Sequence, residues 1–375
     1  MHACVLIAGD FVPQYRVKDL LEKNKFDVVL EEVKTITSQC DFNLVNLEAP
    51  IVVSPECQRI KKNGPNLSAN LRAIEALEYA GFNAVTLANN HIGDYGEWGV
   101  SDTLFYTTKV KLSIVGAGMD ETEAEKVLYK DINGITFAII NCCEHEFGIA
   151  AKAKAGANGL NPIHQYRSIR EAKKKADYII VIVHGGHEMW QLPSPRMVET
   201  YRFFIDAGAD VVVNHHQHCY SGYEKYSGKY IFYGLGNLCF DNPRYRNDIW
   251  NEGYMLKLTF GSELAFELIP YQQCTEQPRI TLLKNRKSFD DRIEEINETI
   301  KSPNLLQFAT DMYYKATSIG MKSAFDLVNN KYFRWLQNKG WMPSLLSEKK
   351  RLKMENLIAC ESHRDKVTYA LSHSY

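Results

Sequence analysis

Two spacings of apolar residues alternate along the chain from Ala3 to Tyr233. Compact apolar runs of strand length recur at Ala3–Ala8, Phe42–Leu47, Ala84–Ala88, Tyr178–Val183 and Asp210–Asn214. The segments between them place apolar residues at helical spacing, which is typical of helices with one buried face. These segments are Asp27–Ser38, Asn70–Ala80, Glu97–Thr108, Pro162–Ala176 and Ser194–Ala207. The alternation predicts an α/β protein.

Two hairpins add antiparallel strands to this order. Asn133-Gly134 is a strong hairpin signal between two apolar runs, and Tyr254–Phe260 with Ala265–Tyr271 reads as a closing antiparallel pair. We therefore expect a mixed sheet or a two-sheet sandwich covered by helices. Beyond Gln277 the pattern becomes helical, at Ser288–Ile300, Pro303–Ala316, Ser323–Leu336 and Ser347–Leu357. We predict a domain of residues 1–277 and a helical C-terminal extension of residues 278–375.

Composition excludes several classes of protein. The 375 residues carry a formal net charge of −1, which gives no basic field for general nucleic-acid binding. The nine cysteines contain no C-x-x-C pair, so we expect reduced thiols and a cytoplasmic location. The first apolar run stops at Asp10, and no run is long enough to span a membrane. We expect no insertion of this chain into a membrane.

Polar side chains follow five of the apolar runs. They are Asp10, Glu48, Asn90 with His91, His184, and His216 with His218. Each has an ordinary reading by itself: a turn, a solvated carboxylate or a core histidine. Ligands of open α/β sheets bind at the carboxyl ends of strands, and an H-x-H pair directs two imidazoles to one place. Taken together, these positions predict a metal site with more than one ion.

The residue types indicate which metals would bind. Oxygen ligands from Asp10, Glu48 and Asn90 combined with imidazoles suit Mn, Fe or Zn, and we expect two divalent ions. Two such ions can share one carboxylate, hold a phosphate and activate water. We expect Glu48 to be the shared carboxylate and His91 to protonate the leaving oxygen.

The order of these motifs resembles a known family. Gly9-Asp10, Asn46-x-Glu48, Asn89-Asn90-His91, His184-Gly-Gly, His216-x-His218 and Gly-x-Gly-Asn237 occur as in the CapA family of poly-γ-glutamate capsule biosynthesis. This family is part of the calcineurin-like metallophosphoesterase superfamily, and the similarity runs from about Ala3 to Phe240. The resemblance implies a four-layer αββα sandwich with a C-terminal helical appendage.

The resemblance also implies roles for individual residues. The metal ligands would be Asp10, Glu48, Asn90, His184, His216 and His218. His91 would be the catalytic histidine, and we assign Asp94 to orienting it. The chain departs from the wider superfamily in two places. Phe11 and Val12 follow Asp10 where an Asp-x-His motif is usual, and Glu48 replaces an aspartate.

Further residues have two readings each. Lys62 lies in a Lys-Lys-Asn-Gly-Pro-Asn loop that resembles the family's basic loop, so it would bind an anionic substrate or remain solvated. Asn237 would contact substrate or form a turn, and we expect His215 not to be a ligand. His187 and Glu188 would contact the imidazoles and fix their tautomers, or serve packing and solvation.

The sequence thus predicts a metal-dependent phosphoester hydrolase that acts in bacterial capsule or cell-surface polymer biosynthesis. Its substrate would be an anionic small molecule or polymer, such as a polysaccharide or poly-γ-glutamate intermediate. Two alternatives stay open. One is a non-catalytic scaffold that binds polymer-synthesis proteins, and the other is a metal-dependent hydrolase of γ-glutamyl amide bonds.

Overall fold

The structure is a computed structural model that describes residues 2–62, 64–323, 330–343 and 345–359. The chain divides into two compact units, Met1–Leu306 and Gln307–Tyr375. All of the predicted site residues belong to the first unit.

The first sheet of this unit has eight strands. Along the sheet they are β16 (Ile280–Leu282), β15 (Ala265–Gln273), β14 (Glu252–Phe260), β1 (Ala3–Val12), β2 (Phe42–Leu47), β3 (Ala84–Thr86) and β4 (Ser113–Val115), with β13 (Asn237–Phe240) also paired to β1. Strands β1 to β4 run parallel, so their carboxyl ends meet at one edge. The predicted pair β14 and β15 is antiparallel, as expected.

The second sheet has six strands. Their order is β11 (Tyr223–Tyr226), β12 (Lys229–Phe232), β10 (Val211–His215), β9 (Tyr178–His184), β7 (Ile135–Cys143) and β6 (Leu128–Ile132). The four central strands are parallel, and the edge strands β11 and β6 are antiparallel to their neighbours. The predicted hairpin at Asn133-Gly134 joins β6 to β7.

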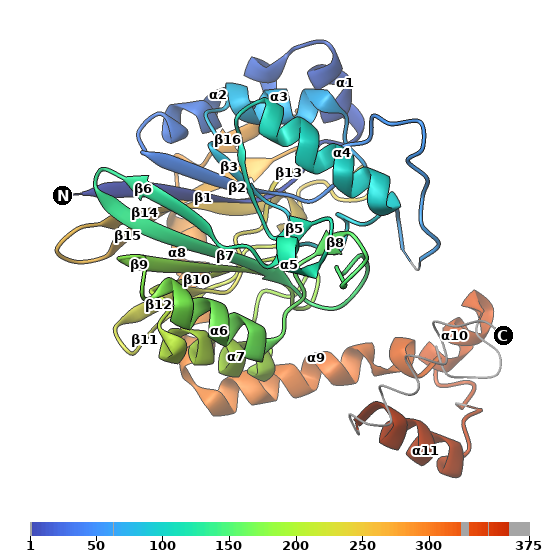
Figure 1. The fold of residues 1–375 in the computed structure, drawn as a ribbon. Helices are drawn as coiled ribbons and strands as arrows, with labels where there is room; N and C mark the ends of the chain where they lie inside the picture. The colour runs from blue at the N-terminus through green and yellow to red at the C-terminus, as the bar shows by residue number, and fades with distance from the viewer. Residues whose placement is uncertain (1, 63, 324–329, 344, 360–375) are drawn as a thin grey trace. The chain divides into compact units, whose positions relative to one another are not determined.

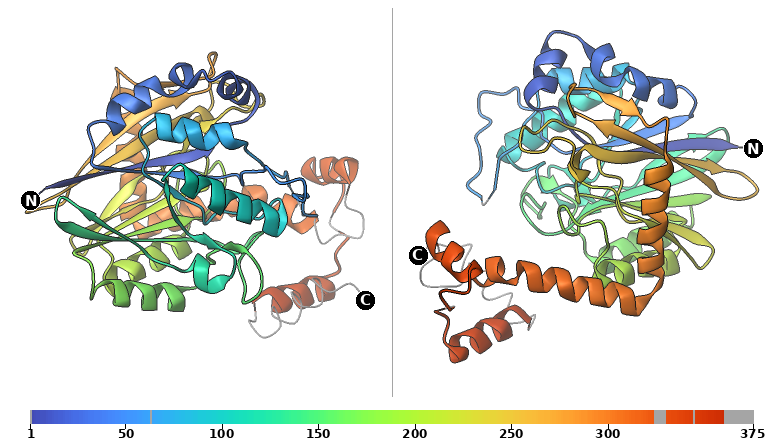
Figure 2. Two further views of the ribbon diagram at one scale, coloured as in Figure 1. Left: turned by 45° about the horizontal axis from the view of Figure 1, so that its top comes forward. Right: turned by 180° about the vertical axis from the view of Figure 1, so that it is seen from behind.

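Helices cover the outer face of each sheet (Figure 1). The first sheet carries α1 (Tyr15–Glu22), α2 (Phe26–Thr37), α3 (Leu71–Tyr79) and α4 (Gly96–Lys109), and the second carries α6 (Pro162–Ala172) and α7 (Pro195–Ala207). Figure 2 shows the same layers from two further sides. The predicted four-layer αββα sandwich is confirmed.

Strand β1 shows how the sequence specifies these layers. Val5 and Ile7 pack in the core between the two sheets, whereas Leu6 and Ala8 pack in the core beneath the helices. A strand that is buried on both faces has to be apolar at every position, because successive side chains point to opposite sides. This requirement explains the continuous apolar runs in the sequence.

Smaller elements complete the first unit. They are β5 (Ala117–Gly118), α5 (Glu121–Ala124), β8 (Gly156–Ala157), a 3-10 turn (Ile249–Asn251) and α8 (Lys287–Lys301). Helix α8 packs against aromatic residues of this unit, since Phe289 contacts Tyr220 and Tyr254. The assignment of residues 278–375 to a separate extension stays a prediction.

The second unit is helical. It contains α10 (Lys331–Asn338), α11 (Glu348–Ala359) and most of α9 (Pro303–Ser323). The predicted helix Ser323–Leu336 lies partly outside the described residues. Within the parts of the chain that the structure describes, no helix combines the length and apolar character needed to cross a membrane.

Several short elements were not predicted: α1, β5, α5, β8, β11, β13, β16 and the 3-10 turn. Helix α1 buries only Val17 and Leu21, so its apolar spacing is too sparse to be seen in the sequence. Strands β13 and β16 are four and three residues long and, unlike β3, are not part of a longer apolar run in the sequence.

Candidate metal centre

Asp10 lies within strand β1 at a break in its pairing. The prediction that this strand ends before Asp10 is wrong, because β1 continues to Val12 after a register shift between Asp10 and Phe11. The backbone of Gly236 presses on Gly9 here: a Cβ added to Gly9 would lie 1.9 Å from the Gly236 carbonyl oxygen. Glycine at position 9 is therefore needed to bring the segment before β13 against β1.

Glu48 and Asn46 come from the end of β2. The amide of Asn46 donates to Asp10 Oδ1 over 2.7 Å and lies 3.3 Å from Nδ1 of His184, while Thr86 donates to its oxygen. Asn46 is buried and links three strands at this edge. It stands within one of the sequence motifs, but no role was predicted for it.

The histidines come from the ends of β9 and β10. His184 is the last residue of β9, and His215 is the last residue of β10. The loop that follows places His216 at φ 91° and His218 at φ 55°. A residue with a Cβ rarely adopts positive φ, and such strain concentrates at functional sites. The unusual backbone turns both imidazoles toward the strand ends.

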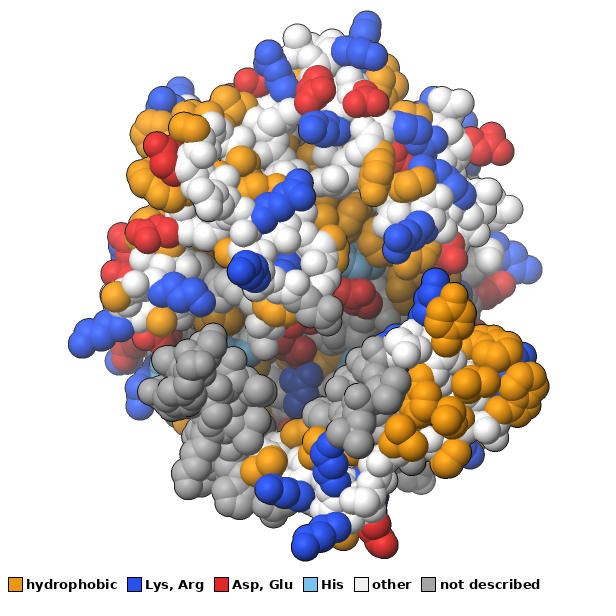
Figure 3. Space-filling model, turned by 90° about the vertical axis from the view of Figure 1, so that its right-hand side faces the viewer, with side chains coloured by type: hydrophobic (Ala, Val, Ile, Leu, Met, Phe, Trp, Pro, Cys, Tyr) orange, Lys and Arg blue, Asp and Glu red, His pale blue; other side chains and the backbone are white. Residues whose placement is uncertain are grey.

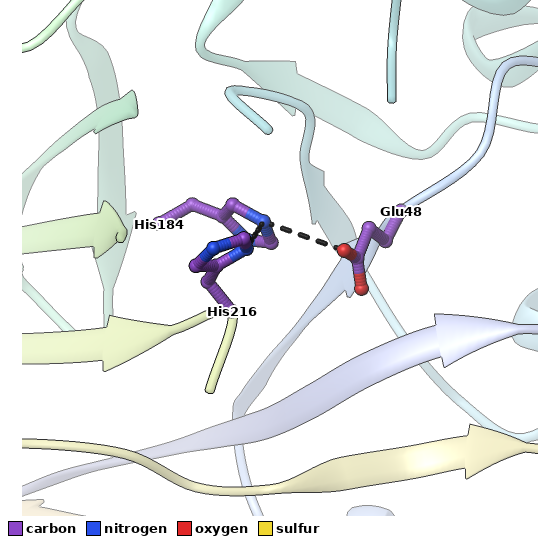
Figure 4. Close-up of side chains that lie close together, drawn as sticks. All are labelled: Glu48, His184 and His216. Carbon is purple, nitrogen blue, oxygen red and sulfur yellow. Dashed lines mark hydrogen bonds and ion pairs between the residues drawn. The ribbon is translucent and has the colours of Figure 1, made fainter. Parts of the chain in front are cut away.

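Glu48, His184 and His216 form a first group of possible metal ligands (Figure 4). Nε2 of His184 lies 3.4 Å from Oε1 of Glu48 and 3.1 Å from Nδ1 of His216. The side-chain oxygen of Asn90 is 3.1 Å from the same nitrogen. Four predicted ligands, from four separate segments, thus place a donor atom around one point.

Asp10, Glu48 and His218 form a second group, so Glu48 belongs to both. His218 Nδ1 faces the side-chain oxygen of Asn237 at 2.9 Å, which places the proton on Nδ1 and leaves the lone pair on Nε2. This Nε2 lies 3.9 Å from Oε1 of Glu48. Glu48 is thus the residue common to both groups, and its role as a shared carboxylate stays a prediction.

The carboxylate of Glu48 tests whether a metal fits here. Both of its oxygens are buried, and neither has a hydrogen-bond partner among the described residues. An ionised carboxylate without a partner is strongly unfavourable in a protein interior. Buried charges of this kind are paired or coordinate metals, so the donor set fits divalent cations.

Burial also prepares the imidazoles for ligation. It lowers the pKa of His184 to about 4, and it lowers the pKa of His216 well below the ordinary value. Burial raises the pKa of Glu48. For His218, burial lowers the pKa, but the carboxylates of Glu48 and Asp10 raise it more. His184 and His216 are therefore neutral near pH 7, as metal ligation requires.

His91 is held beside the two groups by Asp94. Its Nδ1 lies 2.7 Å from Asp94 Oδ2, and Asp94 is fully buried. The ammonium of Lys62 forms an ion pair with Asp94 and lies 3.2 Å from Nδ1 of His91. Asp94 thus contacts His91, the residue it was expected to orient. Lys62 was expected to bind an anionic substrate or to remain solvated, but its side chain is buried in the ion pair with Asp94.

A cavity of about 570 Å³ opens over the site. Five predicted site residues line it: Lys62, Asn90, His91, Glu188 and His218. The other lining residues include Glu146, Phe147, Phe240, Asn242, Arg244, Tyr245 and Trp250. The face in Figure 3 is hollowed, and histidine and acidic side chains are visible inside the hollow. The strand ends are thus accessible to a ligand.

The remaining predicted residues are Asn237, Glu188 and His187. Asn237 is fully buried, and its amide donates to the carbonyls of His218 and Trp250, so it positions His218 and has no surface for a substrate. Glu188 lines the cavity. His187 is half-buried beside Trp190. The imidazole contacts described above come from Asn46 and Asn237, and a tautomer role for His187 and Glu188 stays a prediction.

Glu146 is a site residue that was not predicted from the sequence. Its carboxylate accepts a hydrogen bond from Asn90 over 2.8 Å and lies 3.8 Å from Nε2 of His216. The only signal was its position shortly after the apolar run that became β7.

A four-layer sandwich with carboxylates and imidazoles gathered at the carboxyl ends of two sheets defines a metallophosphoesterase-like protein. Residues 4–242 match the family described as bacterial capsule synthesis protein PGA_cap. This match covers more than half of the chain, and the chain belongs to that family. The resemblance found in the sequence is thereby confirmed.

Curated relatives carry names from capsule and polymer synthesis. The chain is 33% identical over 243 residues to the capsule biosynthesis protein CapA of Bacillus anthracis, which covers 63% of this chain and 59% of that protein. It is 34% identical over 236 residues to the PGA biosynthesis protein CapA of Bacillus subtilis (strain 168), covering 62% of each. The chain thus spans about three fifths of the length of these relatives.

A more distant relative is a probable polyglutamine synthesis accessory protein of Mycobacterium tuberculosis, 27% identical over 57% of this chain and 58% of that protein. Among solved structures, a novel phosphatase from Mycoplasma pneumoniae is similar with a TM-score of 0.45 and 15% identity, covering 72% of this chain and 93% of that one. A 5′-nucleotidase precursor from Thermus thermophilus has a TM-score of 0.44 and 13% identity, covering 76% and 55%. Likenesses at this level do not identify an activity.

Proposed function

We propose that this protein is a metal-dependent phosphoester hydrolase that acts in the synthesis of a bacterial capsule or another cell-surface polymer. The observation that carries the proposal is the buried carboxylate of Glu48, which has no hydrogen-bond partner among the described residues and belongs to both candidate ligand groups. Such a group is stable in its ionised form in the interior only when positive charge neutralises it.

Asp10, Glu48, Asn90, His184, His216 and His218 would hold two divalent ions, with Glu48 shared. Divalent ions at such a site supply charge stabilisation to a phosphate and lower the pKa of a water molecule. Mn, Fe and Zn suit this mixture of oxygen and nitrogen donors.

His91 would act as the general acid. Because Nδ1 of His91 faces the carboxylate of Asp94, the proton on that nitrogen is fixed, and Nε2 is the atom left to serve a ligand in the cavity. Lys62 would hold Asp94 in place through their ion pair. The proton would then pass from Nε2 to the leaving oxygen of the ester.

Capsule or poly-γ-glutamate synthesis is the setting that the family and the named relatives support. We propose an anionic small molecule or polymer intermediate as the substrate. Arg244 lines the cavity and would meet the negative charge of such a ligand. Protein partners of polymer synthesis are proposed on the same ground.

The decisive experiment combines metal analysis with a panel of phosphoesters. The purified chain is loaded with Mn²⁺, its metal content is measured, and hydrolysis of an aryl phosphodiester and several monoesters is followed. A His91→Ala variant should keep its metal and lose about 100-fold or more in turnover, as expected for removal of a general acid. Equal turnover of the parent and this variant contradicts the assignment of His91.

Measurements on the same purified protein also test two other functions. The name of the mycobacterial relative, an accessory protein, favours a non-catalytic scaffold, for which neither metal nor turnover is expected. The relatives named for poly-glutamate synthesis favour hydrolysis of γ-glutamyl amide bonds. Release of glutamate from such a polymer by the parent, but not by His91→Ala, would support that second activity.

A further inference from the structure

Glu146 occupies a position that the motifs of the chain do not account for. Strand β7 ends at Cys143, and the backbone N–H of Glu144 donates to the carbonyl of His184 over 3.0 Å. The N–H of Glu146 then donates to the carbonyl of Glu144 over 3.0 Å. The segment after β7 is therefore fixed to the end of β9, where the first ligand group lies.

A second contact holds the other side of this segment. A Cβ added to Gly93 would lie 2.5 Å from the Cα of Gly148, so the two backbones touch. Gly93 belongs to the turn that carries Asn90 and His91. Only glycine at this crossing lets the segment after β7 lie directly against the turn.

Both oxygens of Glu146 face candidate ligands. Oε2 accepts a hydrogen bond from Nδ2 of Asn90 over 2.8 Å, which leaves the Asn90 oxygen directed at His184. Oε1 lies 3.8 Å from Nε2 of His216, while Nδ1 of His216 faces the ligand group. A carboxylate beside one imidazole nitrogen favours a proton there and leaves the lone pair on the other.

We infer that Glu146 is a positioning residue that orients Asn90 and His216 for metal binding. The inference rests on the proposed metal centre. It assigns Glu146 to the first group, with Glu48, His184 and His216, and not to the second group of Asp10, Glu48 and His218. Loss of Glu146 should therefore weaken the binding of one ion and leave the binding of the other unchanged.

The chain provides a matched control in the same segment. Glu144 forms an ion pair with Arg196 at 2.6 Å, and it is a member of neither ligand group. The side chain of Glu146 is 44% exposed, so its replacement leaves no cavity in the core. Substitutions at both positions are expected to fold.

The test measures Mn²⁺ binding by equilibrium dialysis and calorimetry, without any substrate. Partners that orient ligands typically change metal affinity by about 10- to 100-fold. Glu146→Ala should weaken one of two Mn²⁺ sites by that factor and leave the second as in the parent. The Mn²⁺ affinity of Glu146→Gln should lie between those of the parent and Glu146→Ala, because the amide oxygen can still accept a hydrogen bond from Asn90. Glu144→Gln should have the affinity of the parent.

Each outcome decides one question. Two sites of unchanged affinity in Glu146→Ala would overturn the role of Glu146 and leave the metal centre intact. Equal weakening of both sites, together with a lowered melting temperature, would mean that Glu146 serves the fold rather than one group, and would also overturn it. A parent that binds no Mn²⁺, Fe²⁺ or Zn²⁺ would instead overturn the proposed metal centre itself.

Discussion

The middle and the carboxyl end of the same strands follow opposite rules. In β9 and β10 the middle residues, such as Val181 and Val212, are apolar, fully buried and paired in register. A few residues further along, the chain buries His184 and His216 beside Glu48, whose carboxylate has no hydrogen-bond partner among the described residues. The middle of each strand is thus built for stability, and its end keeps polar groups that oppose folding.

The two regions make opposite contributions to the free energy of folding. Burial of apolar side chains stabilises the sandwich, whereas an unpaired buried carboxylate and positive φ at two histidines destabilise it. Such features persist only where the surrounding structure enforces them. Variants at the two places should therefore separate stability from metal binding.

The largest effect is expected for His216→Ala at the strand end. This variant should lose metal and reduce turnover by about 1,000-fold or more while remaining folded, because a ligand of the first group is gone. Elemental analysis, phosphoester hydrolysis and circular dichroism would measure the three properties. His2→Ala, at an exposed imidazole that belongs to no candidate ligand group of the described residues, is the control and should behave as the parent.

Ile182→Ala, in the middle of β9, should show the opposite behaviour. Ile182 is fully buried between the layers, and truncation of such a side chain costs about 2–5 kcal/mol of the free energy of unfolding. Denaturant unfolding would measure the loss. The folded fraction should still bind the parent's number of metal ions, and a loss of metal from folded molecules would break the separation between the two regions.

Asn237→Ala should give a smaller effect on metal binding, and it should also lower stability because the carbonyls of His218 and Trp250 lose a buried donor. Without the Asn237 oxygen, Nδ1 of His218 is no longer held in one tautomer. We expect the affinity of the second ligand group to fall by about 10- to 100-fold, which titration with Mn²⁺ would detect. Unchanged affinity in a folded variant would argue against this role of Asn237.

The smallest expected effect, and the one with the opposite sign, is that of Glu48→Gln in metal-free protein. Burial raises the pKa of Glu48, so the metal-free fold retains a proton that the unfolded chain loses as pH rises above the ordinary glutamate value. The parent should therefore lose stability with rising pH through this range. Removing the ionisable group should make the metal-free variant about 1–3 kcal/mol more stable near neutral pH.

Thermal unfolding in a chelator at several pH values would test this prediction. With metal present the order should reverse, because bound ions stabilise only the parent. A variant that is less stable than the parent in chelator would show that Glu48 is already compensated without metal.

Much of the sandwich could be predicted from the sequence, for a physical reason. Runs such as Tyr178–Val183 are apolar at every position because both faces of the strand are covered, and α7 carries its cap at Ser194 and a glycine at its end. Elements with few buried residues could not be predicted, and α1 is the example. Long segments with a strong pattern of apolar residues can be recognised in the sequence, whereas short segments with few buried residues cannot.

For the site, the sequence determined which residues stand at the strand ends and which chemistry their side chains allow. How these side chains meet depends on the tertiary structure: Asn237 is closed off behind His218, Glu146 reaches Asn90, and the two groups that share Glu48 form only when both sheets come together. A strand and its polar end are local features that a few consecutive residues specify. The distances between five such ends depend on the register of two sheets and on backbone crossings such as Gly9 with Gly236, which no local pattern contains.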